Sequence, residues 1–139
     1  MLAPLFVEDV MSRDPWQLHV FCKADELVVR IYEATKGFPI DERYGLRGQL
    51  RRAAVSVPTN IVEGSARWSP RDYLHFLNTA QSSASESRYL VHLCGRLQFF
   101  SLDRRNELWT GYDDVCRGLQ TVVSSIKRLE RSKHELRRG

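Results

Sequence analysis

The sequence predicts an all-α fold, an antiparallel up-down four-helix bundle made by one domain. Four segments carry apolar residues three or four positions apart, the spacing of an amphipathic helix. Clusters rich in Gly, Pro or Ser separate these segments. The chain has 139 residues, 42% hydrophobic and 27% charged, which is typical of one folded domain. We expect the bundle to occupy residues 15–131, between an N-terminal extension, 1–14, and a basic C-terminal tail, 132–139.

The first helix is expected from about Trp16 to Lys36. Gly37 follows its last turn and Pro39 cannot continue it, so this pair predicts the end of the helix. One stripe faces the core and contains Phe21, Ala24, Val28, Ile31 and Thr35.

The second helix is expected to begin after Asp41, a favourable N-cap residue. A proline in a helix interior removes a hydrogen bond and costs about 3 kcal/mol, so Pro58 could divide the segment near Ser56. The apolar spacing nevertheless continues through Pro58 to Ile61, which favours one continuous helix, kinked at the proline. Its expected core face is Leu46, Leu50, Ala53, Val57 and Ile61.

Asn60 and Glu63 follow the proline, and two interpretations are open for them. Their side chains could bond to nearby backbone groups that the proline disturbs, or they could be functional surface groups. Local backbone bonding is the favoured interpretation.

The third helix has the clearest start, with Ser69 as N-cap, Pro70 at the first position and Asp72 three residues after the cap. We expect it to reach about Phe99. Its central residues, 79–87, are small, like residues 53–56 of the second helix. Because small facing residues allow a close approach, we expect these two helices to pair there.

The fourth helix is expected from about Ser101. A second apolar row, formed by Trp109, Cys116 and Val123, recurs every seven residues beside its main seam. This row either widens the core-facing stripe or meets another subunit. The main seam contains Leu108, Tyr112, Val115, Leu119, Val122, Ile126 and Leu129.

Charge is divided unevenly along the chain, whose net charge is +4. Residues 1–42 contain eight acidic and four basic residues, residues 43–71 contain six arginines and one glutamate, and residues 127–139 contain six basic and two acidic residues. This pattern predicts a sided surface that binds a polyanion. The alternative is that the arginines are solvated and pair with the acidic N-terminal segment.

The arginines of residues 43–71 are the candidate nucleic-acid-binding residues. Arg43, Arg47 and Arg51 follow one flank of the apolar stripe, with Arg52 nearly opposite its centre. Guanidinium groups suit bidentate phosphate contacts, and a row of them reads phosphate and shape with little base discrimination. Only Tyr44 and Trp68 are interleaved aromatics. The full set is Arg43, Arg47, Arg51, Arg52, Arg67 and Arg71.

The sequence contains no phosphate loop, dinucleotide turn, nucleophile elbow or zinc-helix motif. Asp72 and His75 could share a metal ion, but a di-iron bundle needs a second such pair, which is absent. We therefore expect no enzyme, no cofactor and no metal. Asp72 is better explained as a helix-start residue, and His75 as an exposed neighbour of Phe76.

Three cysteines far apart predict neither a disulfide framework nor a zinc site, which favours a reducing, cytoplasmic location. The apolar runs are too short to span a bilayer. Residues 1–15 lack the basic leader and apolar core of a signal peptide, so we expect no export.

Three adjoining stretches resemble one known family: FCKADELVVRIYEATKGFP, YGLRGQLRRAAVSVPTNIVEGSAR and SPRDYLHFLNTAQSSASE. They resemble the four-helix-bundle family of ribosomal RNA intervening-sequence proteins, which also contains accessory proteins of diversity-generating retroelements. The likeness spans roughly residues 16–130. Residues 1–14 and those after Glu130 look peculiar to this chain.

The resemblance implies an antiparallel four-helix bundle that assembles into a ring-like homopentamer, with a basic surface that engages RNA or DNA. It supplies no catalytic residues. The family's arginine pair falls on Arg51 and Arg52, and its proline, asparagine, glutamate and glycine element falls on Pro58, Asn60, Glu63 and Gly64. The expected function is a non-enzymatic, homo-oligomeric nucleic-acid-binding module. The alternative is a protein-interaction scaffold that does not bind nucleic acid.

Overall fold

Residues 13–139 are described by the structure, a computed structural model, and residues 1–12 of the expected N-terminal extension lie outside that range. Within the described range every regular element is helical, which confirms the all-α class. The elements are η1 (Pro15–Gln17), α2 (His19–Thr35), η2 (Ile40–Glu42), α3 (Leu46–Ser65), α4 (Pro70–Arg96) and α5 (Leu102–Arg138).

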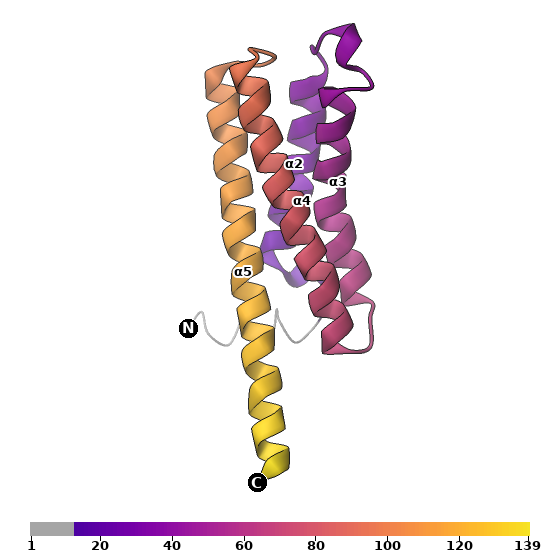
Figure 1. Cartoon of the computed structure of the whole chain (residues 1–139), viewed down its shortest axis with the longest axis vertical. Coiled ribbons are helices and arrows are strands. Elements are labelled where there is room, and N and C mark those ends of the chain that lie inside the picture. The colour runs from indigo at the N-terminus through magenta and orange to yellow at the C-terminus, as the bar shows by residue number, and fades with distance from the viewer. Residues whose placement is uncertain (1–12) are drawn as a thin grey trace.

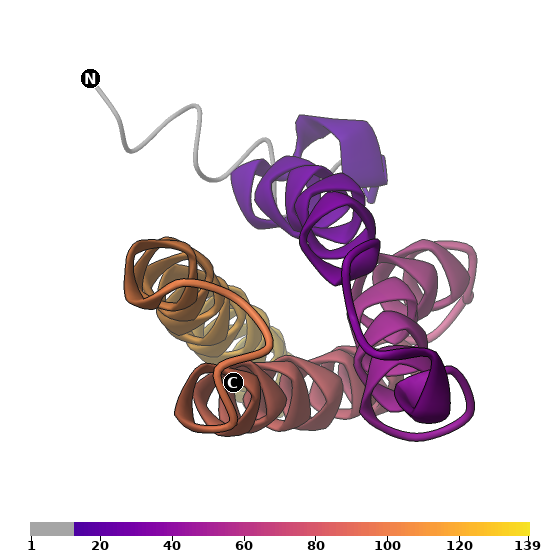
Figure 2. The ribbon, with the colours of Figure 1, turned by 90° about the horizontal axis from the view of Figure 1, so that it is seen from above.

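Four long helices lie side by side, and successive helices run in alternating directions (Figure 1). Seen from above, they occupy the corners of a four-sided bundle (Figure 2). Helices α2 and α4 each pack against both α3 and α5. Each predicted apolar stripe therefore faces a common core.

The core is filled by the predicted stripes, with small residues where helices approach closely. Each helix buries four or more residues of its stripe, while Val28 of α2 and Leu46 of α3 are half-buried against the core. The Ser56 and Ser83 hydroxyls lie 2.8 Å apart across α3 and α4, which confirms the predicted pairing of the small segments. The largest fully buried side chains include Tyr73, Tyr112, Ile31, Leu50, Ile61, Leu77, Leu108 and Leu119.

Serine side chains cap both C-terminal helices, as predicted for Ser69. Ser69 Oγ accepts a hydrogen bond from the Asp72 N–H over 3.1 Å at the start of α4. Ser101 Oγ accepts one from the Arg104 N–H over 3.1 Å at the start of α5. These bonds satisfy backbone donors that have no partner within the helix.

The prediction that α3 begins after Asp41 is wrong. Residues 40–42 form a separate short 3₁₀ turn, and α3 begins at Leu46 with Gly45 as its N-cap residue. The Glu42 carboxylate accepts a hydrogen bond from the Leu46 N–H over 2.9 Å. The acidic residue that satisfies the helix start is therefore Glu42, which approaches from the preceding turn.

Helix α3 continues through Pro58 without interruption. Thr59 Oγ1 donates to the Val55 carbonyl over 2.7 Å, and Asn60 Nδ2 donates to the Ser56 carbonyl over 2.8 Å. These bonds provide additional donors to the backbone next to the proline. The local backbone role predicted for Asn60 is confirmed.

Helix α5 extends well beyond the end of the bundle (Figure 1). Residues 132–138, expected as a basic tail, belong to this helix, and every residue from Arg131 onward is exposed. Its second apolar row lies partly within the protomer: Cys116 is 5% exposed, and Trp109 and Val123 are half-buried against the core. This placement favours the wide core-facing stripe.

Candidate nucleic-acid interface

The six candidate arginines lie at two opposite ends of α3. Arg47, Arg51 and Arg52 lie in its first turns, and Arg43 precedes it. Arg67 follows its last turn and Arg71 lies in the first turn of α4. A helix of 20 residues is about 30 Å long. The block that is continuous in sequence therefore forms two separate basic groups.

Arg51 is bound to the end of α2. Its Nε donates to Thr35 Oγ1 over 2.8 Å, and its Nη2 donates to the Tyr32 carbonyl over 3.2 Å. The guanidinium carbon also lies 4.4 Å from the centre of the Tyr32 ring. The last carbonyls of a helix lack partners within the helix and favour a nearby cation. Arg51 is thus a cap for α2 as well as a candidate phosphate ligand.

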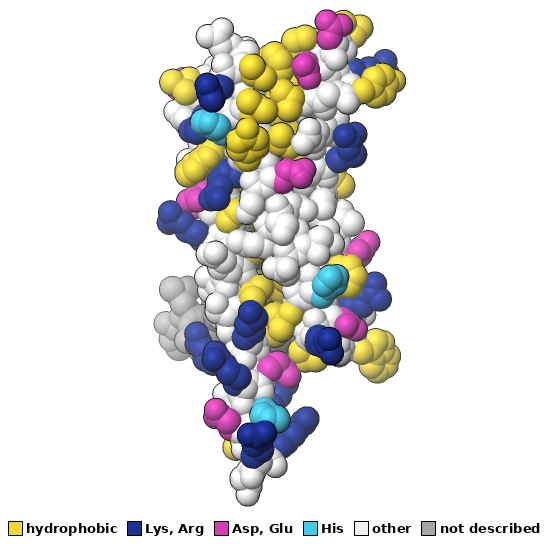
Figure 3. Space-filling model, in the orientation of Figure 1, with side chains coloured by type: hydrophobic (Ala, Val, Ile, Leu, Met, Phe, Trp, Pro, Cys, Tyr) yellow, Lys and Arg dark blue, Asp and Glu magenta, His cyan; other side chains and the backbone are white. Residues whose placement is uncertain are grey.

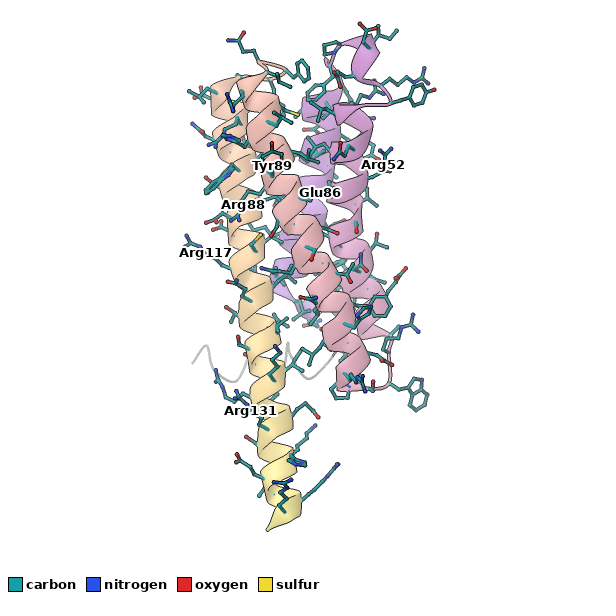
Figure 4. All side chains as sticks on the ribbon, in the orientation of Figure 1. Arg52, Glu86, Arg88, Tyr89, Arg117 and Arg131 are labelled. Carbon is teal, nitrogen blue, oxygen red and sulfur yellow. The ribbon has the colours of Figure 1, made fainter. Side chains whose placement is uncertain are left out.

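Arg52 points away from the bundle on α3 (Figure 4). It is exposed, and together with Arg51 it lines a shallow groove of about 400 Å³. The other lining residues are Tyr32, Val55, Ser56, Thr59, Asn60 and Glu63. Arg47 lies one turn earlier and is half-buried. A phosphate can approach Arg52 from solvent without breaking a contact described above.

Arg43 and Arg67 both lie over aromatic rings. The guanidinium carbon of Arg43 is 5.5 Å from the centre of the Tyr44 ring, and that of Arg67 is 4.7 Å from the centre of the Phe76 ring. Such stacking holds the planar cation in place and leaves its edge donors available. Arg43 and Arg67 are both exposed.

Across residues 13–139, none of the six candidate arginines forms an ion pair with a carboxylate. The alternative of arginines neutralised by the acidic N-terminal segment is thus not seen in the described part of the chain. The ion pairs found there use other cations, namely Lys23, Arg30, Arg88, Arg117 and Lys133.

Positive charge also gathers at the end of the bundle where α3 meets α4. Lys and Arg side chains, with acidic side chains among them, gather on the projecting part of α5 and recur near the α3–α4 loop (Figure 3). Pro70 at the start of α4 and Lys133 of α5 line the same depression, so α5 brings Lys133 beside that loop. Two blocks that are about 60 residues apart in the sequence thus meet.

A cluster on α4 and α5 was missed by sequence reasoning. The guanidinium carbons of Arg88 and Arg105 each lie 5.5 Å from the centre of the Trp109 ring. Arg105 Nη2 is 3.0 Å from His92 Nδ1, and Arg88 donates to Asp113 over 2.7 Å. The sequence between the two basic blocks is nearly neutral in charge, so counting charges did not point to this cluster. The only signal available from the sequence was the helical spacing of Arg88 and His92, which places them on one face.

The described residues provide no group of three or more His, Cys, Asp or Glu side chains that could hold a metal ion. His75 is exposed with its ring 5.6 Å from that of Phe76, as predicted. All three cysteines are free thiols, and burial raises the pKa of Cys94 to about 11, with Glu42 adding a smaller rise. A thiol protonated at neutral pH is a poor nucleophile.

Between residues 13 and 139, no helix is long and apolar enough to cross a membrane.

Comparison with known proteins identifies one family. The model of the family described as 23S rRNA-intervening sequence protein matches residues 16–121. The chain is also similar in structure to a protein of unknown function from the S23 ribosomal protein family of Bacteroides thetaiotaomicron. The TM-score is 0.70 at 23% sequence identity, covering 76% of this chain and 95% of that chain. No curated protein matches the chain.

Proposed function

Since the chain belongs to the 23S rRNA-intervening sequence protein family, we propose that it is a non-enzymatic module that binds structured RNA or DNA. Recognition uses phosphate and shape contacts from a rigid helical surface, with little reading of bases. The supporting observation is that the six candidate arginines have no carboxylate partner in the described residues. Unneutralised guanidinium groups on a rigid helix are suited to phosphate binding.

Within this surface the arginines contribute differently. Arg52 and Arg47 on α3, and Arg71 on α4, are the primary phosphate ligands because, among residues 13–139, no hydrogen bond occupies their side chains. Arg43 and Arg67 present guanidinium edges from stacked positions. Arg51 contributes its charge, while two of its donors remain on α2.

The module acts as a homo-oligomer, and the family resemblance implies a pentameric ring. Repeating a modest basic surface around a ring raises avidity without any new contact, because the second binding event becomes intramolecular. Light scattering on the purified full chain tests the assembly: a monomer at micromolar concentration contradicts it. We place the protein in the cytoplasm, where free thiols such as the exposed Cys22 stay reduced.

The binding experiment compares a structured RNA hairpin and a duplex DNA over a range of salt concentrations. Affinity falls steeply with salt, because each neutralised phosphate releases counterions. Replacing Arg47 and Arg52 together by Ala lowers both the affinity and the salt slope. Absence of binding to every RNA and DNA at low salt contradicts the proposal.

A protein-interaction scaffold is the second candidate, favoured by apolar side chains exposed on α2 and α3. Val29, Val55 and Val62 are 57%, 38% and 43% exposed on these helices. Purification from native lysate after nuclease treatment separates the two functions. A partner protein that remains bound after nuclease supports the scaffold, whereas loss of all partners supports the nucleic-acid module.

A further inference from the structure

Trp68 lies in the short loop between α3 and α4 and is 100% exposed. The backbone on both sides of it is held. On one side the Arg67 carbonyl accepts a hydrogen bond from Arg13 Nη1 over 2.6 Å, while the Arg67 guanidinium stacks on Phe76. On the other side Ser69 caps α4. The fold thus presents a large aromatic ring to solvent on an anchored loop, and burial of that ring contributes nothing to stability.

The packing beneath the loop is also close. Gly64, in the last turn of α3, leaves so little room that an added Cβ would lie 2.8 Å from Phe76 Cβ and 3.0 Å from Tyr73 Cδ1. The Arg67 N–H donates to the Gly64 carbonyl over 3.1 Å. The two helices and the start of the loop therefore form one rigid support for Trp68.

Cations lie beside this loop. Arg71 is exposed in the first turn of α4. A depression of about 140 Å³ beside the loop is lined by Arg13 and Lys133 among others. Glu130, which also lines it, lies 3.5 Å from Lys133 in an exposed pair and neutralises part of the charge.

Trp68 differs from the other aromatic residue singled out in the sequence, Tyr44. Tyr44 is 87% exposed, but the Arg43 guanidinium lies over its ring. No guanidinium lies over the Trp68 ring in the part of the chain that the structure describes. Both faces of the indole are therefore open to a planar group.

We propose that the α3–α4 end of the bundle binds an unpaired nucleotide strand, with a base stacked on Trp68. Phosphates of that strand lie on Arg71 and in the depression that Arg13 and Lys133 line. An aromatic ring beside cations suits a single strand, because every base has a π-face while the bases of a duplex are stacked on each other. The inference builds on the proposed nucleic-acid function and adds a site about one helix length from Arg52.

Fluorescence anisotropy tests the site with two labelled probes, a short oligouridylate and a blunt RNA duplex. Stacking on one aromatic side chain is worth about 1–3 kcal/mol, so Trp68→Ala weakens oligouridylate binding at least about fivefold. Duplex binding stays within about twofold, since the duplex offers no free base to stack. Trp68→Tyr restores most of the lost affinity. Tyr89→Ala is the matched control, because Tyr89 is also exposed, at 59%, but lies in the C-terminal third of α4, far from the α3–α4 loop (Figure 4).

Three results overturn the inference: no binding of oligouridylate at low salt, equal losses for both probes in Trp68→Ala, or no loss at all. A fourth such result is a changed oligomeric state of Trp68→Ala in light scattering. That change would place the indole in a subunit interface instead. If the Trp68 test fails while duplex binding stays intact and salt-dependent, the proposed function still stands. If neither oligouridylate nor the duplex binds, both the inference and the proposed function are contradicted.

Discussion

Arg51 Nε donates to Thr35 Oγ1 over 2.8 Å, and the same guanidinium lies over the Tyr32 ring at 4.4 Å. Thr35 is the last residue of α2 and is fully buried, and its hydroxyl donates in turn to the Ile31 carbonyl over 2.8 Å. One arginine therefore joins α3 to the end of α2. Its neighbour Arg52 makes no such contact and faces solvent.

The adjacent residues Arg51 and Arg52 are expected to differ in their effect on stability. Arg51→Ala lowers the free energy of unfolding by about 1–3 kcal/mol, because it removes charge-assisted hydrogen bonds and leaves the Thr35 hydroxyl without its donor. Arg52→Ala changes it by no more than about 0.5 kcal/mol, as expected for a solvated side chain. Urea denaturation of both variants measures the difference. Equal effects on stability contradict the distinct role of Arg51.

At Gly64, α3 packs closely against α4. In Gly64→Ala the new methyl group meets Phe76 Cβ at 2.8 Å and Tyr73 Cδ1 at 3.0 Å, so the two helices must move apart. We expect a loss of about 1–3 kcal/mol in the free energy of unfolding. Gly37→Ala is the matched control, because an added Cβ there meets nothing within 4 Å. A neutral Gly64→Ala contradicts the close packing.

The sequence was sufficient for the helices and the core because both depend on local rules. Ser69 and Ser101 bond to N–H groups three residues ahead, and a stripe at helical spacing has only one face on which to be buried. The start of α3 was mispredicted because Glu42 reaches Leu46 from a separate turn. Capping preferences are defined for single residues next to the helix start, so they do not describe a carboxylate that approaches from a separate turn.

The site was less predictable because it depends on which groups meet in space. Counting charges placed Arg43 to Arg71 in one block, although α3 separates its two ends. Thr35 was assigned to an apolar stripe, and its bond to Arg51 left no local signal in the sequence. That Lys133 and the start of α4 line one depression likewise depends on the length and direction of α5.

Stability falls at alkaline pH because buried groups hold their protons in the folded state. Burial raises the pKa of Cys94 from 9.0 to about 11 and also raises the pKa of Tyr73 and Tyr112. The thiol contribution is complete below pH 9.0 and is lost as pH rises toward 11, since the unfolded chain loses a proton that the folded chain keeps. The slope is about 1.4 kcal/mol per pH unit for each such group.

Urea denaturation at a series of alkaline pH values measures this decline. Cys94→Ala removes one titrating group, so its free energy of unfolding falls less steeply over the range that the thiol controls, between 9.0 and about 11. The variant also loses some stability at every pH because it leaves a small cavity. An identical slope in both proteins contradicts a thiol that stays protonated in the core.

The salt dependence of binding tests the central claim, that the bundle presents unneutralised arginines to phosphates. Affinity for an RNA hairpin is measured at several salt concentrations for the natural chain and for Arg47→Ala with Arg52→Ala. Each lost phosphate contact lowers the slope of log affinity against log salt by about 0.7–0.9, so the double variant should lose roughly 1.5 from it. No binding at low salt, or an unchanged slope in the double variant, contradicts the claim.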